Sequence, residues 1–171
     1  MQYMKTKPHY KQGEKDHFTM IFSCPGRIEK INNHPVSGTT GKNLNELIKI
    51  INQKQNHIKL VFKEITITNA WEKPIHKNKD KVTEVKNSMI KSKDNVYRVY
   101  SEIKETKEII FVFGLKAKLA IEEIKKYHAI NIPVIYSRHL SLTSLNQLSK
   151  NNLRTTQEKL DFVANHIINQ I

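Results

Sequence analysis

Cysteine is nearly absent from this sequence: Cys24 is the single one among 171 residues. One cysteine cannot close a disulfide within the chain, and it excludes metal or iron–sulfur sites that need several cysteine ligands. Apolar runs are short as well, and none approaches the roughly 20 residues that cross a bilayer. No apolar stretch follows the charged start at Lys5, which argues against a secretory signal. We therefore expect a cytoplasmic protein with no membrane partner.

Acidic residues are scarce relative to basic ones, with 16 Asp and Glu against 29 Lys and Arg and a net charge of +13. An A+T-rich genome enriches Lys, Asn and Ile, and this alone makes a protein basic. The excess is nevertheless large for one small domain, and lysines that neutralise phosphates release condensed counterions. The charge favours a phosphate-bearing partner but leaves DNA, RNA and an anionic membrane open.

Apolar patterning predicts strands that alternate with helices. The predicted strands are His17–Ser23, 58–68, Ile109–Phe113 and Ile132–Tyr136. Helical spacing of apolar residues predicts helices at 44–51, at 116–127 and near the C-terminus, and a further helix around 81–91. We interpret 1–16 as a flexible basic arm and 26–41 as a long loop. The length fits one domain over 1–171, and the alternation predicts a parallel sheet with helices on both faces.

Three polar segments follow the predicted strands, and they are Ser23–Gly26, Asn69–Trp71 and Arg138–Ser144. Because ligands of such sheets bind at the carboxyl ends of the strands, these segments are expected to converge there. Polar loops end the strands of any α/β protein, so the convergence locates a site without naming its chemistry.

The glycine-rich segment Gly38-Thr39-Thr40-Gly41-Lys42 is not a P-loop. Val36 stands where that motif has its first glycine, and Asn43 stands where it has Ser or Thr. The segment can still bind a phosphate through close backbone approach and the amides of a helix N-terminus. A turn that only starts the following helix explains it equally well.

Three single residues have both a structural and a functional interpretation. Cys24 is either a packing residue or, at a strand end, a nucleophile without a neighbouring base in the sequence. Trp71 either packs at the strand edge or stacks on a base. His139 follows a buried strand, which makes a catalytic role as plausible as a structural one. The histidines show no metal-ligand spacing, so we expect neither a metal nor a cofactor.

Four segments together resemble the uracil-DNA glycosylase superfamily, and the resemblance is greatest to its thermostable-type branch. A Pro-Gly turn with a following acid, Pro25-Gly26 and Glu29, precedes a Pro-x-x-Gly-x-x-Gly stretch that runs from Pro35 to Gly41. The other segments are a strand ending in Asn69, the apolar run Ile110–Leu115 that closes on glycine, and His139-Leu140-Ser141 in place of a His-Pro-Ser motif. They occur in the family's order over residues 20–145.

The resemblance implies a three-layer α/β/α sandwich with a short, mainly parallel sheet. It also implies a monofunctional DNA glycosylase that flips a base out of DNA and hydrolyses its bond to the sugar. His139 would donate to the departing base, Asn69 would read the base edge, and Glu29 is one candidate, beside Glu72, for the acid that places water. The remaining implied residues line the base pocket (Ser23, Cys24, Pro25, Gly26, Val36) or bind DNA phosphates (Gly38, Thr39, Gly41, Lys42, Arg138, Ser141).

Departures from the family pattern bear on the substrate. Ser23 and Cys24 stand where the family has a carboxylate or amide, and Val36 stands where relatives have an aromatic that stacks on uracil. The cysteines for the branch's iron–sulfur cluster are missing. We hypothesise a wider pocket for a modified pyrimidine, as in antiphage relatives that excise glucosylated hydroxymethylcytosine. The alternatives are a uracil-DNA glycosylase of base-excision repair and a non-catalytic DNA-binding module. We expect a monomer with DNA as its partner.

Overall fold

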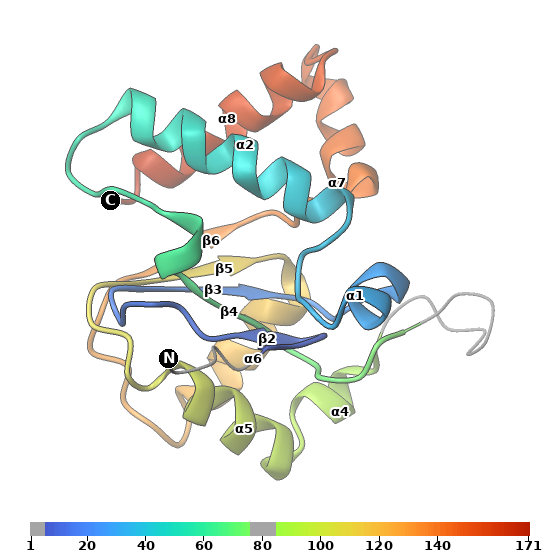
Figure 1. Cartoon of the computed structure of the whole chain (residues 1–171), viewed down its shortest axis with the longest axis vertical. Coiled ribbons are helices and arrows are strands. Elements are labelled where there is room, and N and C mark those ends of the chain that lie inside the picture. Colours follow the sequence, from blue (N-terminus) through green and yellow to red (C-terminus); the bar gives the residue numbers. More distant parts are fainter. Residues whose placement is uncertain (1–5, 76–84) are drawn as a thin grey trace.

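The computed structural model describes residues 6–75 and 85–171, and these form a six-stranded sheet between two layers of helices (Figure 1). The strand order is β1-β2-β4-β3-β5-β6, in which β4, β3, β5 and β6 are parallel and β1 and β2 are antiparallel additions at one edge. The strands are β1 Thr6–Lys7, β2 Tyr10–Lys11, β3 Phe18–Phe22, β4 Thr66–Asn69, β5 Ile109–Phe113 and β6 Val134–Ser137. The expected three-layer, mainly parallel fold is confirmed.

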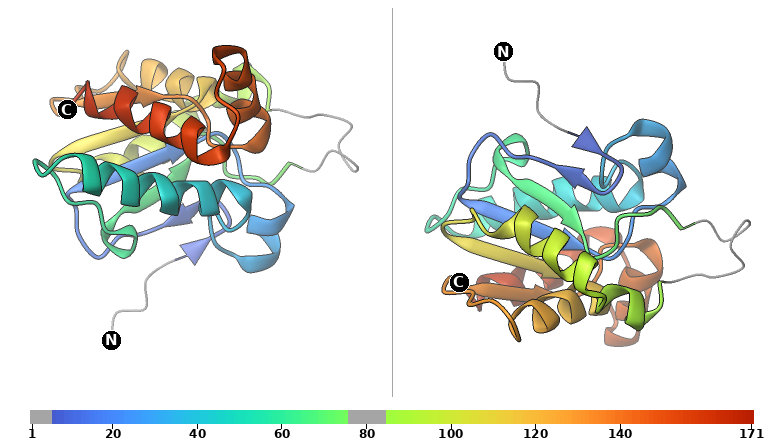
Figure 2. Two further views of the ribbon diagram at one scale, coloured as in Figure 1. Left: turned by 90° about the horizontal axis from the view of Figure 1, so that it is seen from above. Right: turned by 90° about the horizontal axis from the view of Figure 1, so that it is seen from below.

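Helices α2 and α8 cover one face of the sheet, and α4, α5 and α6 cover the other (Figures 1 and 2). Two short helices, α1 and α7, lie at the edge where the parallel strands end. The helices are α1 Arg27–Asn32, α2 Thr39–Lys54, α4 Asn87–Ile90, α5 Lys93–Ile103, α6 Leu115–Ile124, α7 Leu142–Asn146 and α8 Thr156–Ile168, with 3-10 turns at Phe62–Glu64 and Gln147–Asn151. Within the described residues, no helix is long and apolar enough to traverse a bilayer.

The two faces of the sheet carry separate apolar cores. Alternate side chains of β3 and β5, such as Phe22 and Phe113, pack under α2 and α8. The intervening side chains, such as Ile21 and Val112, pack against α5 and α6. Every residue of β3 and of β5 is buried, which explains why their sequences are continuous apolar runs.

The connections create a switch point between β3 and β5. The chain leaves β3 toward α2 on one face, and it leaves β5 toward α6 on the other face. Adjacent parallel strands whose following helices lie on opposite faces leave a crevice at their carboxyl ends, where ligands of such sheets bind. We therefore expect a ligand site among the segments that follow β3, β4, β5 and β6.

The expectation of a flexible arm at 1–16 is wrong from Thr6 onward; residues 1–5 lie outside the described part of the chain. Strand β2 pairs with β4, and His9 and Lys11 are buried. The Lys11 ammonium donates to the carbonyls of Phe62 (2.9 Å), Lys63 (3.2 Å) and Ile65 (2.9 Å). These three acceptors satisfy the charge, which allows a basic segment to fold against the sheet.

Other boundaries differ from the sequence expectations. The strand expected over 58–68 begins only at Thr66, because a 3-10 turn precedes it. Helix α1 interrupts the expected loop over 26–41, and helix α5 was not expected at all. The helix expected around 81–91 is described only in part, as α4 from Asn87, since 76–84 lie outside the described residues.

Candidate functional site

The last row of the parallel sheet brings four side chains together on the face covered by α2. In register, Asn69 of β4 stands opposite Phe22 of β3, and Phe113 of β5 stands opposite Ser137 of β6. The pairing of Ile21 with Val112 puts Phe22 beside Phe113, and their rings stack with centroids 4.8 Å apart. These two core rings, each 1% exposed, lie between two polar side chains at the carboxyl edge, and we call the pair the aromatic floor. The sequence expectations did not include either ring.

Asn69 contributes an unsatisfied acceptor to this row. The side chain is 3% exposed, and its Oδ1 has no hydrogen-bond partner. Ile67, two residues earlier, packs in the core under α2, so the Asn69 side chain lies on the same face of β4. A buried acceptor without a partner costs about 1–3 kcal/mol, and such a group in a native protein calls for an explanation such as a ligand.

His139 lies beside the same aromatic floor. Its ring meets Phe22 edge-on, with centroids 6.1 Å apart and planes at 87°. Gly114, which follows β5, has a φ of 91°, and a Cβ there would lie 3.2 Å from the His139 Cβ. The glycine therefore both forms the left-handed turn after β5 and leaves room for the histidine.

The hydrogen bonding of His139 defines its tautomer. The backbone N–H of Ser141 donates to His139 Nδ1 at 3.0 Å. An amide can only donate, so Nδ1 accepts and the proton of the neutral imidazole is on Nε2. In this tautomer the N–H donor of the ring is Nε2.

Asn43 of α2 braces the loop that carries His139. Its Nδ2 donates to the carbonyl of Leu140 at 2.8 Å, and both residues are buried. The sequence contained a hint of this role: Asn43 is a polar residue four positions before Leu47 on the apolar stripe of a helix. The sequence interpretation of Asn43, as a departure from the P-loop motif, did not include this contact.

The segment Ser23–Gly26 follows β3 and is fixed by backbone bonds to the chain after β4. Trp71 N–H donates to the Ser23 carbonyl at 3.1 Å, and Ile75 N–H donates to the Pro25 carbonyl at 3.1 Å. Pro25 is buried, whereas Ser23, Cys24 and Gly26 are half-buried. This confirms the expected meeting of the segments after two strands.

Glu29 has a clear local role. Its Oε2 accepts from the backbone N–H of Gly26 at 3.0 Å, which caps the start of α1 and closes the Pro25-Gly26 turn. Glu29 and Glu72 are the two acids that could position water. The contact that the structure shows for Glu29 stabilises the Pro25-Gly26 turn. Glu72 is half-buried and lies close enough to Arg98 to interact with its charge.

Val36 adopts an unusual backbone conformation for a β-branched residue, with a φ of 48°. Left-handed φ values of this kind cost about 1–3 kcal/mol and persist only where surrounding structure enforces them. Here the side chain is 8% exposed and belongs to the core under α2. The Val36 carbonyl packs on Gly41 so closely that a Cβ at Gly41 would lie 1.6 Å from its oxygen.

The residues expected to bind phosphate fall into two groups. Gly38 is the N-cap of α2, Thr39 and Lys42 are exposed in its first turn, and that turn contains no acidic residue. Such a helix end favours an anion. In contrast, Arg138 donates to the Ser144 carbonyl at 2.8 Å, and Ser141 Oγ accepts from Ser144 N–H at 3.3 Å as the N-cap of α7.

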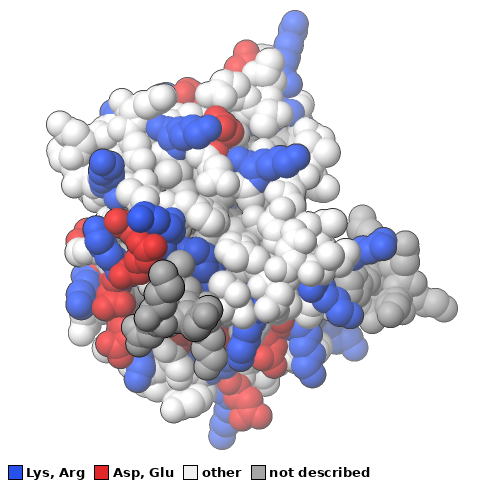
Figure 3. All heavy atoms as spheres, in the orientation of Figure 1, with Lys and Arg blue, Asp and Glu red and all other residues white. Residues whose placement is uncertain are grey.

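Charge is spread unevenly over the molecule. Figure 3 shows Lys and Arg scattered over the face that it presents, acidic side chains gathered with basic ones toward the lower left, and a largely uncharged area beside α1. Ion pairs such as Lys15–Glu64 and Lys63–Glu14 use part of the basic excess. The net positive charge is therefore not compensated evenly.

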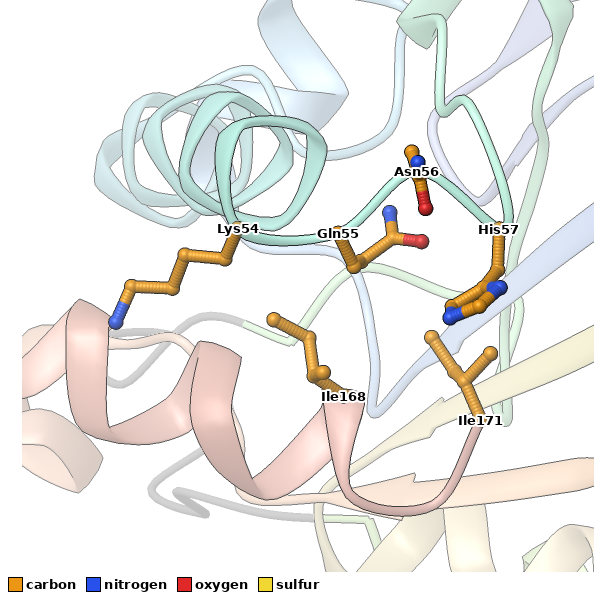
Figure 4. Close-up of a pocket in the computed structure, with 6 residues that line it drawn as sticks. All are labelled: Lys54, Gln55, Asn56, His57, Ile168 and Ile171. Carbon is orange, nitrogen blue, oxygen red and sulfur yellow. The ribbon is translucent and has the colours of Figure 1, made fainter.

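A hollow of about 410 Å³ lies at the opposite edge of the molecule, between the ends of α2 and α8 (Figure 4). Two of its polar side chains, Lys54 and Gln55, have partners within the chain. Lys54 pairs with Asp161 at 2.6 Å, and the Gln55 side chain both donates to and accepts from the backbone of Ile58. Since no expected site residue lines this hollow, the carboxyl edge of the sheet is the better candidate.

Among residues 6–75 and 85–171, no three His, Cys, Asp or Glu side chains are grouped as a metal site. Neither a protein-family model nor a curated protein matches the chain. The case for a function therefore depends on the geometry of the carboxyl edge.

Proposed function

We propose that the protein is a DNA glycosylase, which removes a modified pyrimidine from its sugar and leaves an abasic site. One observation carries the proposal: a buried, unpartnered Asn69 Oδ1 and a histidine with Nε2–H as donor flank the same stacked phenylalanine. The acceptor suits a ring N–H or amino group of a base, and the donor suits a base oxygen. The order of the sequence motifs supports the same assignment.

The chemistry needs few protein groups. A flipped base would enter the crevice, and the bond between its nitrogen and C1′ of the sugar would break with the electron pair passing to the base. Nε2–H of His139 would stabilise the negative charge that develops on the base oxygen. The oxygen of a water molecule then bonds to C1′, and the proton that it loses balances the charge of the departing base.

We infer the substrate within this class from the departures from the family pattern. Positions 23 and 24 carry Ser and Cys, so neither has a carboxylate or amide side chain. Val36 is small, and its side chain lies in the core. These features favour a pyrimidine that carries an additional group, and glucosylated hydroxymethylcytosine of phage DNA is our proposed substrate, in antiphage defence. The positive net charge and the first turn of α2 support DNA as the partner.

One observation favours a second candidate, a non-catalytic DNA-binding module. The Glu29 Oε2 accepts from the Gly26 amide and caps α1, which gives this acid a structural role that does not depend on catalysis. Such a module would bind DNA without forming abasic sites.

The test uses three duplexes of identical sequence that differ at one base: glucosylated hydroxymethylcytosine, hydroxymethylcytosine or uracil. We expect abasic sites, detected by alkaline strand cleavage, in the glucosylated duplex. His139→Ala should lower the rate by about 100-fold or more, as for loss of one charge-stabilising donor, and leave DNA binding within a few-fold. His57→Ala, an exposed histidine at the opposite hollow, serves as the control.

The other outcomes discriminate among the candidates. Cleavage of the uracil duplex alone would reject the modified base and retain a glycosylase. DNA binding without abasic sites in any duplex would reject catalysis and support the binding module. Equal rates for His139→Ala and His57→Ala would reject the role of His139.

A further inference from the structure

A partly buried ionic network lies behind Asn69, on the face of the sheet opposite its side chain. Glu102 of α5 is its centre, and His9, Thr68, Arg98 and Asn95 complete what we call the Arg98–Glu102 network. Glu102 accepts from Arg98 Nη1 at 2.7 Å and from the Thr68 hydroxyl at 2.5 Å. His9 Nε2 lies 3.2 Å from the other carboxylate oxygen.

Arg98 directs this network at the end of β4. Its Nη2 donates to the carbonyls of Asn69 at 3.0 Å and Ala70 at 3.2 Å, and also to Asn95 Oδ1 at 2.8 Å. Asn95 Nδ2 donates to the same Ala70 carbonyl at 2.9 Å. Two side chains thus hold the two carbonyls where the strand leaves the sheet.

The same two residues are also held from the side of β3. Ala70 N–H donates to the Phe22 carbonyl at 2.7 Å, and Asn69 stands in register with Phe22. The backbone of Asn69 and Ala70 is therefore fixed from two directions, whereas the Asn69 side-chain oxygen has no partner. Fixing the backbone limits where the amide can point without using its acceptor.

We propose that Arg98 is a positioning residue, which holds the end of β4 so that the Asn69 amide faces the crevice in the orientation that a base requires. This inference rests on the proposed function, because it assigns Asn69 a bound base. The planar guanidinium suits the task, since its several N–H groups reach Glu102, Asn95 and two carbonyls from one side chain. A lysine ammonium at this position cannot reproduce that set of contacts.

Lys11 of β2 offers a matched control near the other end of β4. Like the half-buried Arg98, this buried cation donates to backbone carbonyls, but its acceptors Phe62, Lys63 and Ile65 precede β4. Removing it should destabilise the protein in the same manner as removing Arg98 does. Only the Arg98 substitution should disturb Asn69.

The experiment compares Arg98→Met, Arg98→Lys and Lys11→Met in the full chain. The first readout is the side-chain amide resonance pair of Asn69 in 1H–15N spectra, assigned by its loss in Asn69→Ala. We expect both Arg98 variants to shift or broaden this pair and Lys11→Met to leave it in place. If Arg98→Met does not fold, Arg98→Lys, which keeps the cation, gives the same comparison.

The second readout is the single-turnover rate of base release per folded molecule. A displacement of a substrate-positioning group by about 1 Å can cost 100-fold, so we expect Arg98→Met to lose 10-fold or more and Arg98→Lys to recover part of this. Unchanged Asn69 resonances in folded Arg98 variants would overturn the proposal. Shifted resonances in a protein that releases no base would retain the positioning role and reject the glycosylase.

Discussion

Substitution of Gly41 by alanine tests the close contact between α2 and the backbone carbonyl of Val36. Helix propensity alone would make Gly41→Ala stabilising by about 1 kcal/mol, because glycine is a poor helix former. The structure predicts the opposite sign. A Cβ at Gly41 would lie 1.6 Å from the Val36 oxygen and 2.7 Å from its carbonyl carbon, both of which are backbone atoms.

The magnitude follows from the movement required. Ordinary contact begins near 3.4 Å, so the segment at Val36 would have to retreat by about 1.8 Å. Overpacking of this kind costs about 1–3 kcal/mol or more, and Val36 is already held at a φ of 48° with a buried side chain. We therefore expect a net loss of about 2 kcal/mol in the free energy of unfolding, or roughly 4–8 °C in Tm.

Urea unfolding followed by Trp71 fluorescence and circular dichroism measures this change, since Trp71 is the single tryptophan. Thr40→Ala in the same turn of α2 is the control, because it raises helix propensity without a comparable clash, and it should stay within about 0.5 kcal/mol. A neutral or stabilising Gly41→Ala would show that Val36 does not pack on α2 in this way. The conformation inferred for this side of the crevice would then be wrong.

Three further predictions concern single polar groups. Burial lowers the pKa of Lys11 from 10.5 to about 8, so between these pH values the unfolded chain binds more protons than the folded chain. The free energy of unfolding should therefore rise with pH over this window. An equal slope in Lys11→Met would contradict the lowered pKa. Asn43→Ala should lower the free energy of unfolding in urea by about 1–3 kcal/mol. Asn43→Asp should lower it more, because a carboxylate oxygen would then face the Leu140 carbonyl. The reverse order of the two variants would refute this hydrogen bond. Long-range 1H–15N spectra of neutral His139 should show the proton on Nε2, and protonation of Nδ1 would exclude the bond from Ser141.

The sequence predicted the centre of the sheet well, and the reason is burial on both faces. Ile109–Phe113 forms a strand with the expected bounds, because a continuous apolar run has only one stable place in an α/β fold. The meeting of the segments after β3, β4 and β6 follows from the parallel pairing. It put Asn69 and His139 near the same ring without any knowledge of the loops.

Charged residues in buried positions could not be predicted in this way. Arg98 and Lys11 have partners 28 or more residues away, and local sequence gives no indication of these distant carbonyls. Helix α5 itself was detectable, since Val96, Val99 and Ile103 repeat at helical spacing and are all buried. The sequence interpretation made no prediction for residues 96–108, so it did not include this helix.

The end of β4 shows why the geometry supports a ligand more strongly than any motif does. On one side, the carbonyls of Asn69 and Ala70 receive bonds from two side chains of α5 and are more than satisfied. On the other side, the Asn69 oxygen is buried without a partner beside an aromatic floor. Arg98 and Glu102 satisfy the polar groups behind Asn69, whereas no side chain of the described residues pairs with its Oδ1. A donor from a ligand would satisfy this acceptor, and the base-release and resonance experiments above test our proposal that a flipped base supplies it.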